Sequence, residues 1–134
     1  MKFLVVEDDF AARRLLQILL SEYGLCLVAT NGREAVEAFS QAMEDDDPYD
    51  LVCLDIMMPE MDGHQALQAI RQIEAEHGIQ GLDGVKIIMT TALKDSDNVF
   101  GAFREGCEAY LVKPVKKARL LEAMDQLGLA IHDV

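Results

Sequence analysis

Five short apolar runs, separated by segments of helical periodicity, constrain the fold of this chain more than any other feature of its sequence. Several runs are apolar at every position, as expected of strands that are covered on both faces. The segments between and after them repeat apolar residues at the spacing of amphipathic helices, and one such segment contains Val99 and Phe103. The pattern predicts a three-layer α/β fold, in which a doubly wound parallel sheet of five strands has helices on both faces. The runs cover residues 3–6, 25–29, 51–54, 85–89 and 109–112.

The length of the chain and its turn residues indicate one domain. Its 134 residues can bury a sizeable core without disulfide bonds or structural metals. Turn-forming pairs such as Asn31-Gly32 separate the expected elements, and none of these breaks has the composition of a linker. We therefore predict a domain over residues 1–127, followed by a C-terminal tail over residues 128–134.

The charge and the cysteines exclude several classes of function. Twelve Lys and Arg residues against twenty-four Asp and Glu residues give a net charge of −12, which would repel the phosphate backbone of a nucleic acid. No apolar run approaches a membrane span, and acidic residues from Glu7 onward interrupt the first run too early for a signal peptide. We expect a cytoplasmic protein without direct nucleic-acid or membrane contacts. Its three widely spaced cysteines are expected to be reduced thiols packed as small hydrophobic groups.

Acidic residues follow two of the expected strands. Glu7, Asp8 and Asp9 come after the first run, and Asp55 comes directly after the third. In an open parallel sheet, ligands bind beyond the carboxyl ends of the strands, where the strand order reverses. Carboxylates from two strands would therefore meet in one crevice, and an all-oxygen cluster of this kind suits a hard cation such as Mg²⁺.

The other strand ends carry a hydroxyl and an ammonium group. Thr90, Thr91 and Ala92 end the fourth expected strand, and Lys113 ends the fifth. Each group alone has an ordinary interpretation. The acidic residues after the first strand would favour the N-terminus of a helix, and Asp55 could cap a loop. The threonines could be ordinary β-formers, and Lys113 could be a solvated residue at the end of a strand. Together, four strand ends supply what is needed to hold a metal-bound phosphoryl group on a carboxylate.

Four segments at these strand ends occur in the order and at the spacing of a known family. Together they resemble the receiver domain of two-component response regulators, in its CheY-like single-domain form. The resemblance spans nearly the whole chain, from residue 2 to about residue 127, and it implies the flavodoxin-like (βα)5 arrangement. The segments are Phe3-Leu4-Val5-Val6-Glu7-Asp8-Asp9, Leu54-Asp55-Ile56-Met57-Met58-Pro59-Glu60-Met61-Asp62-Gly63, Thr90-Thr91-Ala92 and Tyr110-Leu111-Val112-Lys113-Pro114.

The resemblance implies a phosphoacceptor and a metal site. Asp55 would receive a phosphoryl group from a histidine kinase or a phosphotransfer protein and form an acyl phosphate. Glu7 and Asp8 would be the acidic pair for Mg²⁺, with Mn²⁺ as a substitute. Asp8, Asp55 and the backbone carbonyl of Met57 would be the direct ligands. Asp9 would lie outside the metal shell and begin the first helix.

The resemblance also implies a switch. Thr91 would move its hydroxyl to the phosphoryl group, Tyr110 would be the coupled aromatic side chain, and Lys113 would pair with the phosphoryl group. Ala92 is small and would leave room beside that group. The bond between Lys113 and Pro114 would be cis, which only proline makes inexpensive.

The implied role is that of a phosphorylated switch rather than an enzyme, since the domain would catalyse only its own phosphorylation and dephosphorylation. Partner docking, or pairing with a second copy, would use the face formed by residues 95–127. Because the chain stops soon after its last expected helix, its output would pass to another molecule, unless the sequence is part of a longer protein.

Two features depart from the family pattern. Residues 74–84 look longer than the usual connection and are expected to form a mobile surface loop, with a partner contact as the alternative. Met57 and Leu93 lie two residues after the acceptor and two after the switch threonine, and both are apolar where they would flank the phosphoryl group. We therefore expect slow loss of phosphate from Asp55.

Three other functions would use part of this pattern. A Mg²⁺-dependent phosphohydrolase with an aspartate nucleophile would resemble a D-x-D motif, but Met57 occupies its second acidic position. A flavodoxin-like FMN binder would need backbone donors where Glu7 introduces negative charge. A receiver-like interaction module that is never phosphorylated would not need the complete set of acidic, hydroxyl and ammonium groups.

Overall fold

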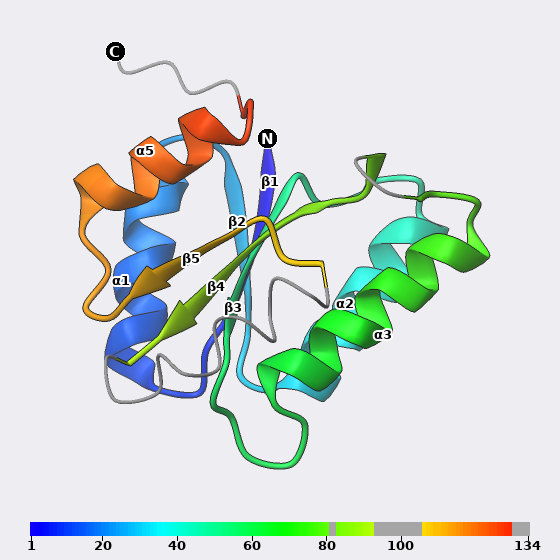
Figure 1. Ribbon diagram of the computed structural model, residues 1–134, viewed down its shortest axis with the longest axis horizontal. Helices are drawn as coiled ribbons and strands as arrows, with labels where there is room; N and C mark the ends of the chain where they lie inside the picture. Colours follow the sequence, from blue (N-terminus) through cyan, green and yellow to red (C-terminus); the bar gives the residue numbers. More distant parts are fainter. Residues whose placement is uncertain (81–82, 93–105, 130–134) are drawn as a thin grey trace.

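The computed structural model of the protein describes residues 1–80, 83–92 and 106–129. Five strands form one sheet in the order β2-β1-β3-β4-β5, and every neighbouring pair is parallel. This arrangement confirms the predicted parallel sheet (Figure 1). The strands are β1 (Lys2–Val6), β2 (Leu25–Ala29), β3 (Leu51–Asp55), β4 (Lys86–Thr91) and β5 (Ala109–Val112).

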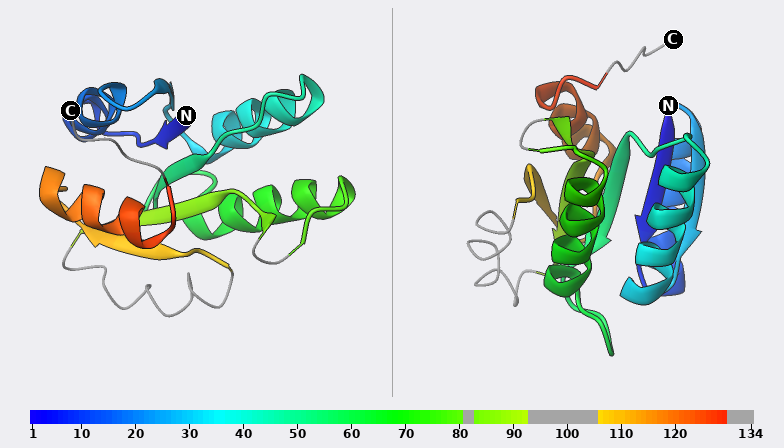
Figure 2. Two further views of the ribbon diagram at one scale, coloured as in Figure 1. Left: turned by 90° about the horizontal axis from the view of Figure 1, so that it is seen from above. Right: turned by 90° about the vertical axis from the view of Figure 1, so that its right-hand side faces the viewer.

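Helices cover both faces of the sheet, as the doubly wound fold requires. Helices α1 (Phe10–Ser21) and α5 (Lys117–Gln126) lie on one face, and α2 (Gly32–Glu44) and α3 (Gly63–Glu76) lie on the other (Figure 2). The helix expected around Val99 and Phe103 lies outside the described residues. Within the described part of the chain, no helix combines the length and the apolar character needed to cross a membrane.

The central strands are apolar at successive positions because each one contributes to two cores. Side chains alternate between the faces of a strand, so Phe3 and Val5 pack toward α1 and α5, whereas Leu4 and Val6 pack toward α2 and α3. Cys53 is buried in the first of these cores, where burial raises the pKa of its thiol to about 12. The thiol is therefore protonated and packs as a small hydrophobic group, as expected.

Each helix that follows β1, β2 or β3 begins on a short polar side chain. Asp9, Asn31 and Asp62 accept hydrogen bonds from backbone N–H groups in the first turns of α1, α2 and α3, respectively. The prediction that Asp9 begins the first helix is confirmed. Gly63 follows its cap directly, and a Cβ there would lie 2.4 Å from the carbonyl oxygen of Asp55. Only glycine lets α3 begin so close to the end of β3.

The predicted end of the fourth strand is confirmed, and the predicted start of the loop before it was wrong. The fourth strand runs from Lys86 to Thr91, so the expected threonines follow its apolar run and continue the pairing with β3 and β5. The loop expected over residues 74–84 begins later, since α3 continues to Glu76. Glu74 is buried, and its carboxylate accepts hydrogen bonds from Arg71 Nη1 at 2.7 Å and from the backbone N–H of Val85 at 2.6 Å.

Candidate phosphoacceptor and cation site

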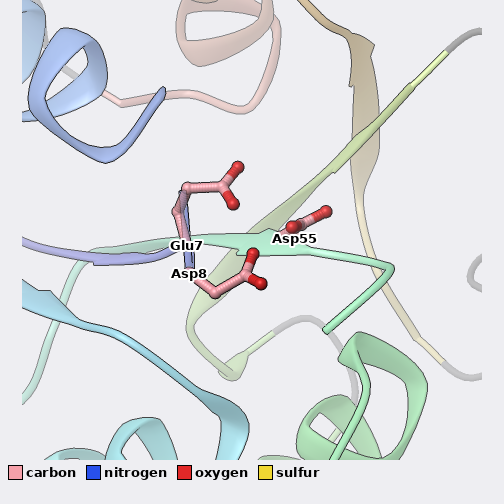
Figure 3. A group of neighbouring side chains, drawn as sticks. All are labelled: Glu7, Asp8 and Asp55. Carbon is pink, nitrogen blue, oxygen red and sulfur yellow. The ribbon is translucent and has the colours of Figure 1, made fainter. Parts of the chain in front are cut away.

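The site lies at the carboxyl ends of β1 and β3, where the strand order reverses. After β1 the chain returns to β2 on one side, and β3 pairs with β1 on the other. Glu7 and Asp8 follow β1, and Asp55 is the last residue of β3. One carboxylate oxygen from each of these residues lies within 4.8 Å of the other two (Figure 3). The predicted meeting of the acidic residues is therefore confirmed.

Lys113, which follows β5, brings a positive charge into this cluster. Its Nζ atom lies 2.5 Å from Oε1 of Glu7 and 3.1 Å from Oδ2 of Asp55. The backbone supports the same carboxylates, since Asp9 N donates to Oε2 of Glu7 at 3.1 Å and Met57 N donates to Oδ1 of Asp55 at 3.3 Å. Glu7 is thus held by an ammonium group on one oxygen and by an amide on the other.

Burial and mutual repulsion set the electrostatics of the site. Burial raises the pKa of Glu7, and the ion pair with Lys113 opposes this only in part. Desolvation and the neighbouring Glu7 raise the pKa of Asp8. Burial alone would lower the pKa of Lys113, but its ion pairs with Glu7 and Asp55 raise it overall. One ammonium group faces three carboxylates, so the site has negative charge in excess.

The donor atoms of this site fit a hard divalent cation. All three are carboxylate oxygens, which suit Mg²⁺, an ion that usually keeps several waters. Glu7 is fully buried and engaged with Lys113, whereas Asp8 is exposed. Because Asp8 is accessible and Glu7 is already paired, Asp8 and Asp55 are the better candidates for direct ligands of the cation, and Glu7 is the better candidate for orienting Lys113.

Of the remaining predicted residues, the two threonines lie at the same strand ends, and Tyr110 lies two residues before the end of β5. Thr90 is buried and pairs in register with Asp55. Thr91 ends β4, is fully buried, and donates its hydroxyl hydrogen to the carbonyl of Ala92 at 3.1 Å. Tyr110 lies on β5 with 42% of its surface exposed. Leu93 lies outside the described residues.

Two further expectations concern the loops beside the acceptor. The peptide bond between Lys113 and Pro114 is cis, as predicted. Met57 lies in the loop after β3 and its side chain is 53% exposed. Its place beside a phosphoryl group and its effect on hydrolysis both stay predictions.

Sequence reasoning missed one residue that contacts this site. Arg13 on α1 donates from Nη1 to the carbonyl oxygens of Glu7 and Asp8, at 3.0 Å and 3.4 Å. A signal for it existed, because Arg13 lies four residues after the helix cap Asp9 and helical side chains lean toward the N-terminus of their helix.

Comparisons with known proteins agree with this geometry. A family model described as a response regulator receiver domain matches residues 3–125. The chemotaxis protein CheY of Bacillus subtilis (strain 168) is 35% identical over 127 residues, which cover 93% of this chain and 95% of that protein. The likeness therefore extends over nearly the whole length of both proteins.

Solved structures show the same fold. The receiver domain of the histidine kinase CKI1 from Arabidopsis thaliana, complexed with Mg²⁺ and BeF3⁻, is 25% identical with a TM-score of 0.78, and the match covers 96% of this chain and 90% of that one. A chain in the co-crystal structure of the Saccharomyces cerevisiae phosphotransfer protein Ypd1 and the receiver domain of Ssk1 is 26% identical with a TM-score of 0.78, covering 96% and 88%. The chain belongs to the family of response regulator receiver domains of two-component systems.

Proposed function

We propose that this receiver domain accepts a phosphoryl group on Asp55, changes conformation in response and thereby controls a partner protein. The observation that carries the proposal is the meeting of Asp55 with Glu7, Asp8 and Lys113 at one edge of the sheet. Asp55 supplies a carboxylate nucleophile, and the groups around it can neutralise the charge of a phosphoryl group.

The proposed transfer is a single displacement at phosphorus. An oxygen of Asp55 forms a bond to phosphorus, the bond from phosphorus to the leaving group breaks, and the electron pair departs with that group. Lys113 lies 3.1 Å from Asp55 and can pair with an oxygen of the transferred group. When bound, Mg²⁺ would supply the remaining charge neutralisation, held by Asp8, Asp55 and the carbonyl of Met57. The domain would turn over no substrate beyond its own phosphorylation and dephosphorylation.

The proposed partners follow from the same chemistry. The donor would be a phosphohistidine on a histidine kinase or a phosphotransfer protein, and the solved complex of Ypd1 with the receiver domain of Ssk1 supports a phosphotransfer partner. The downstream effector, or a second copy of the chain, would dock on the face of residues 95–127. Of this face, the structure describes residues 106–127, which include β5 and α5.

The proposed switch uses a hydroxyl that can change its partner. Thr91 now donates to the carbonyl of Ala92, and a phosphoryl oxygen on Asp55 would offer it a stronger, charged acceptor. A contact available only in the phosphorylated state shifts the balance between two conformations. Tyr110 on β5 would then carry the change to the docking face.

Intact-mass measurement after incubation with acetyl phosphate and Mg²⁺ tests the proposal. The wild type should gain one phosphoryl group, Asp55→Asn should gain none, and Asp46→Asn, an exposed site outside the cluster, should behave as the wild type. An unmodified wild type, or a modified Asp55→Asn protein, would contradict the assignment. Sustained release of phosphate from a small phosphomonoester would instead indicate a phosphohydrolase.

A further inference from the structure

Arg13 is the cationic side chain of α1 that joins this helix to the acidic loop after β1. Its Nη1 group donates to the carbonyl of Glu7 at 3.0 Å and to that of Asp8 at 3.4 Å. The guanidinium carbon lies over the Phe10 ring, 5.5 Å from its centre, in a cation–π contact. One guanidinium group therefore contacts two consecutive carbonyl groups.

The loop needs such support because its side chains repel one another. Glu7, Asp8 and Asp55 place three carboxylate oxygens within 4.8 Å of one another, and among these three residues Lys113 forms ion pairs with Glu7 and Asp55. Without a cation, the repulsion favours movement of Asp8 away from Asp55. Asp8 is exposed and follows the end of β1, so the strand ladder does not hold it in place.

We propose that Arg13 is a positioning residue for the divalent cation: by holding the carbonyls of Glu7 and Asp8, it keeps their carboxylates aimed at Asp55. This inference rests on the proposed function, because it assumes that the cluster binds Mg²⁺. Groups that orient metal ligands without touching the metal typically change its affinity by about 10- to 100-fold when they are removed.

The sign of the effect separates positioning from simple electrostatics. Arg13 is a positive charge beside a cation site, so its removal should strengthen Mg²⁺ binding if only its charge mattered. If Arg13 positions the ligands, its removal should weaken binding. Arg14 is a matched control on the same helix, because its Nη1 group donates to the side chain of Gln17 at 3.0 Å rather than to the loop.

The test is an NMR titration of the unphosphorylated full chain with Mg²⁺ alone, comparing wild type, Arg13→Met and Arg14→Met. We expect Arg13→Met to bind Mg²⁺ about tenfold more weakly, and Arg14→Met to bind as tightly as the wild type or more tightly. Arg13→Lys, which keeps the charge but not the forked pair of donors, should show a smaller loss in the same direction and serves if Arg13→Met does not fold.

A second readout needs no metal. The backbone N–H of Asp9 donates to Oε2 of Glu7 at 3.1 Å, so its hydrogen exchange in the metal-free protein should be faster in Arg13→Met than in Arg14→Met. Equal or tighter Mg²⁺ binding by Arg13→Met, or an unchanged exchange rate at Asp9, overturns the inference while the proposed function stands. A wild type that binds no Mg²⁺ overturns both.

Discussion

Asp8 shows how a single residue of the site can reduce stability. Desolvation and the neighbouring Glu7 raise its pKa above the ordinary value of 3.8. A carboxyl group with a higher pKa in the folded than in the unfolded protein destabilises the fold when it is ionised, and this penalty disappears as the pH falls below 3.8. At neutral pH, the ionised side chain should therefore oppose folding.

We predict that Asp8→Asn stabilises the metal-free protein near neutral pH by about 0.5 kcal/mol, a small value because the side chain is exposed. Urea denaturation in the presence of a chelator measures it, and the gain should vanish in acid, where Asp8 is neutral. The same substitution should weaken Mg²⁺ binding by removing a direct ligand. If Asp8→Asn lowers the free energy of unfolding while Asp46→Asn leaves it unchanged, repulsion at Asp8 does not destabilise the fold.

The lifetime of the proposed acyl phosphate is the second property that we expect single residues to control. Met57 offers only a weak acceptor to a hydrolytic water and Leu93 offers none. We predict that Met57→Asn combined with Leu93→Glu releases phosphate from Asp55 faster than the wild type, as followed by phosphate release after removal of the donor. An equal or slower rate in the double variant would refute this role for the two apolar side chains.

At the scale of elements, Arg71 joins α3 to the chain segments that precede β4 and β5. It donates to Oε1 of Glu74 at 2.7 Å and to Oε1 of Glu108 at 2.6 Å. It also donates to the backbone carbonyls of Val85 at 2.9 Å and of Gly106 at 2.6 Å. All three nitrogen atoms of the guanidinium group therefore donate hydrogen bonds in one partly buried network.

We predict that Arg71→Met lowers the free energy of unfolding by about 3 kcal/mol, because it leaves the buried carboxylate of Glu74 without its cation. Urea denaturation with and without Glu74→Gln checks the cause, since neutralising Glu74 should recover part of the loss. Arg14→Met, on an exposed part of α1, should have little effect. A loss that Glu74→Gln deepens would contradict this explanation.

At the scale of the whole molecule, β5 connects the acidic cluster to the face proposed for docking. Lys113 follows this strand directly and reaches Asp55, while Tyr110 and Val112 expose 42% and 38% of their surfaces. Because β5 is a short strand at the edge of the sheet (Figure 1), we infer that it would transmit a change at Asp55 to that face.

We predict that beryllofluoride with Mg²⁺ shifts or broadens the amide NMR signals of residues 95–127 more than those of α1 and α2. Beryllofluoride stands in for the phosphoryl group, so Asp55→Asn should show none of these changes and is the control. Changes confined to α1 and α2 would place the switching surface elsewhere on the molecule.

The sequence by itself determined the layers of the fold and the acidic residues of the site. Apolar runs covered on both faces are a local property, and so is the end of each strand, which is why the sequence predicts Asp55 and Lys113 at strand ends. The observed boundaries of β2 and β5 match the predicted ones for the same reason. The start of the loop before β4 did not match, because α3 continues to Glu76.

Only the tertiary structure decided how the charges are shared. Lys113 pairs with both Glu7 and Asp55, Arg13 holds backbone carbonyls, and Arg71 contacts Glu108, which is 37 residues away in the chain. The periodicity of the sequence does not predict such contacts. A charged residue has the same place in the pattern whether its side chain is solvated or lies in a network of hydrogen bonds and ion pairs. The difference arises from distance and burial, which exist only once the chain has folded.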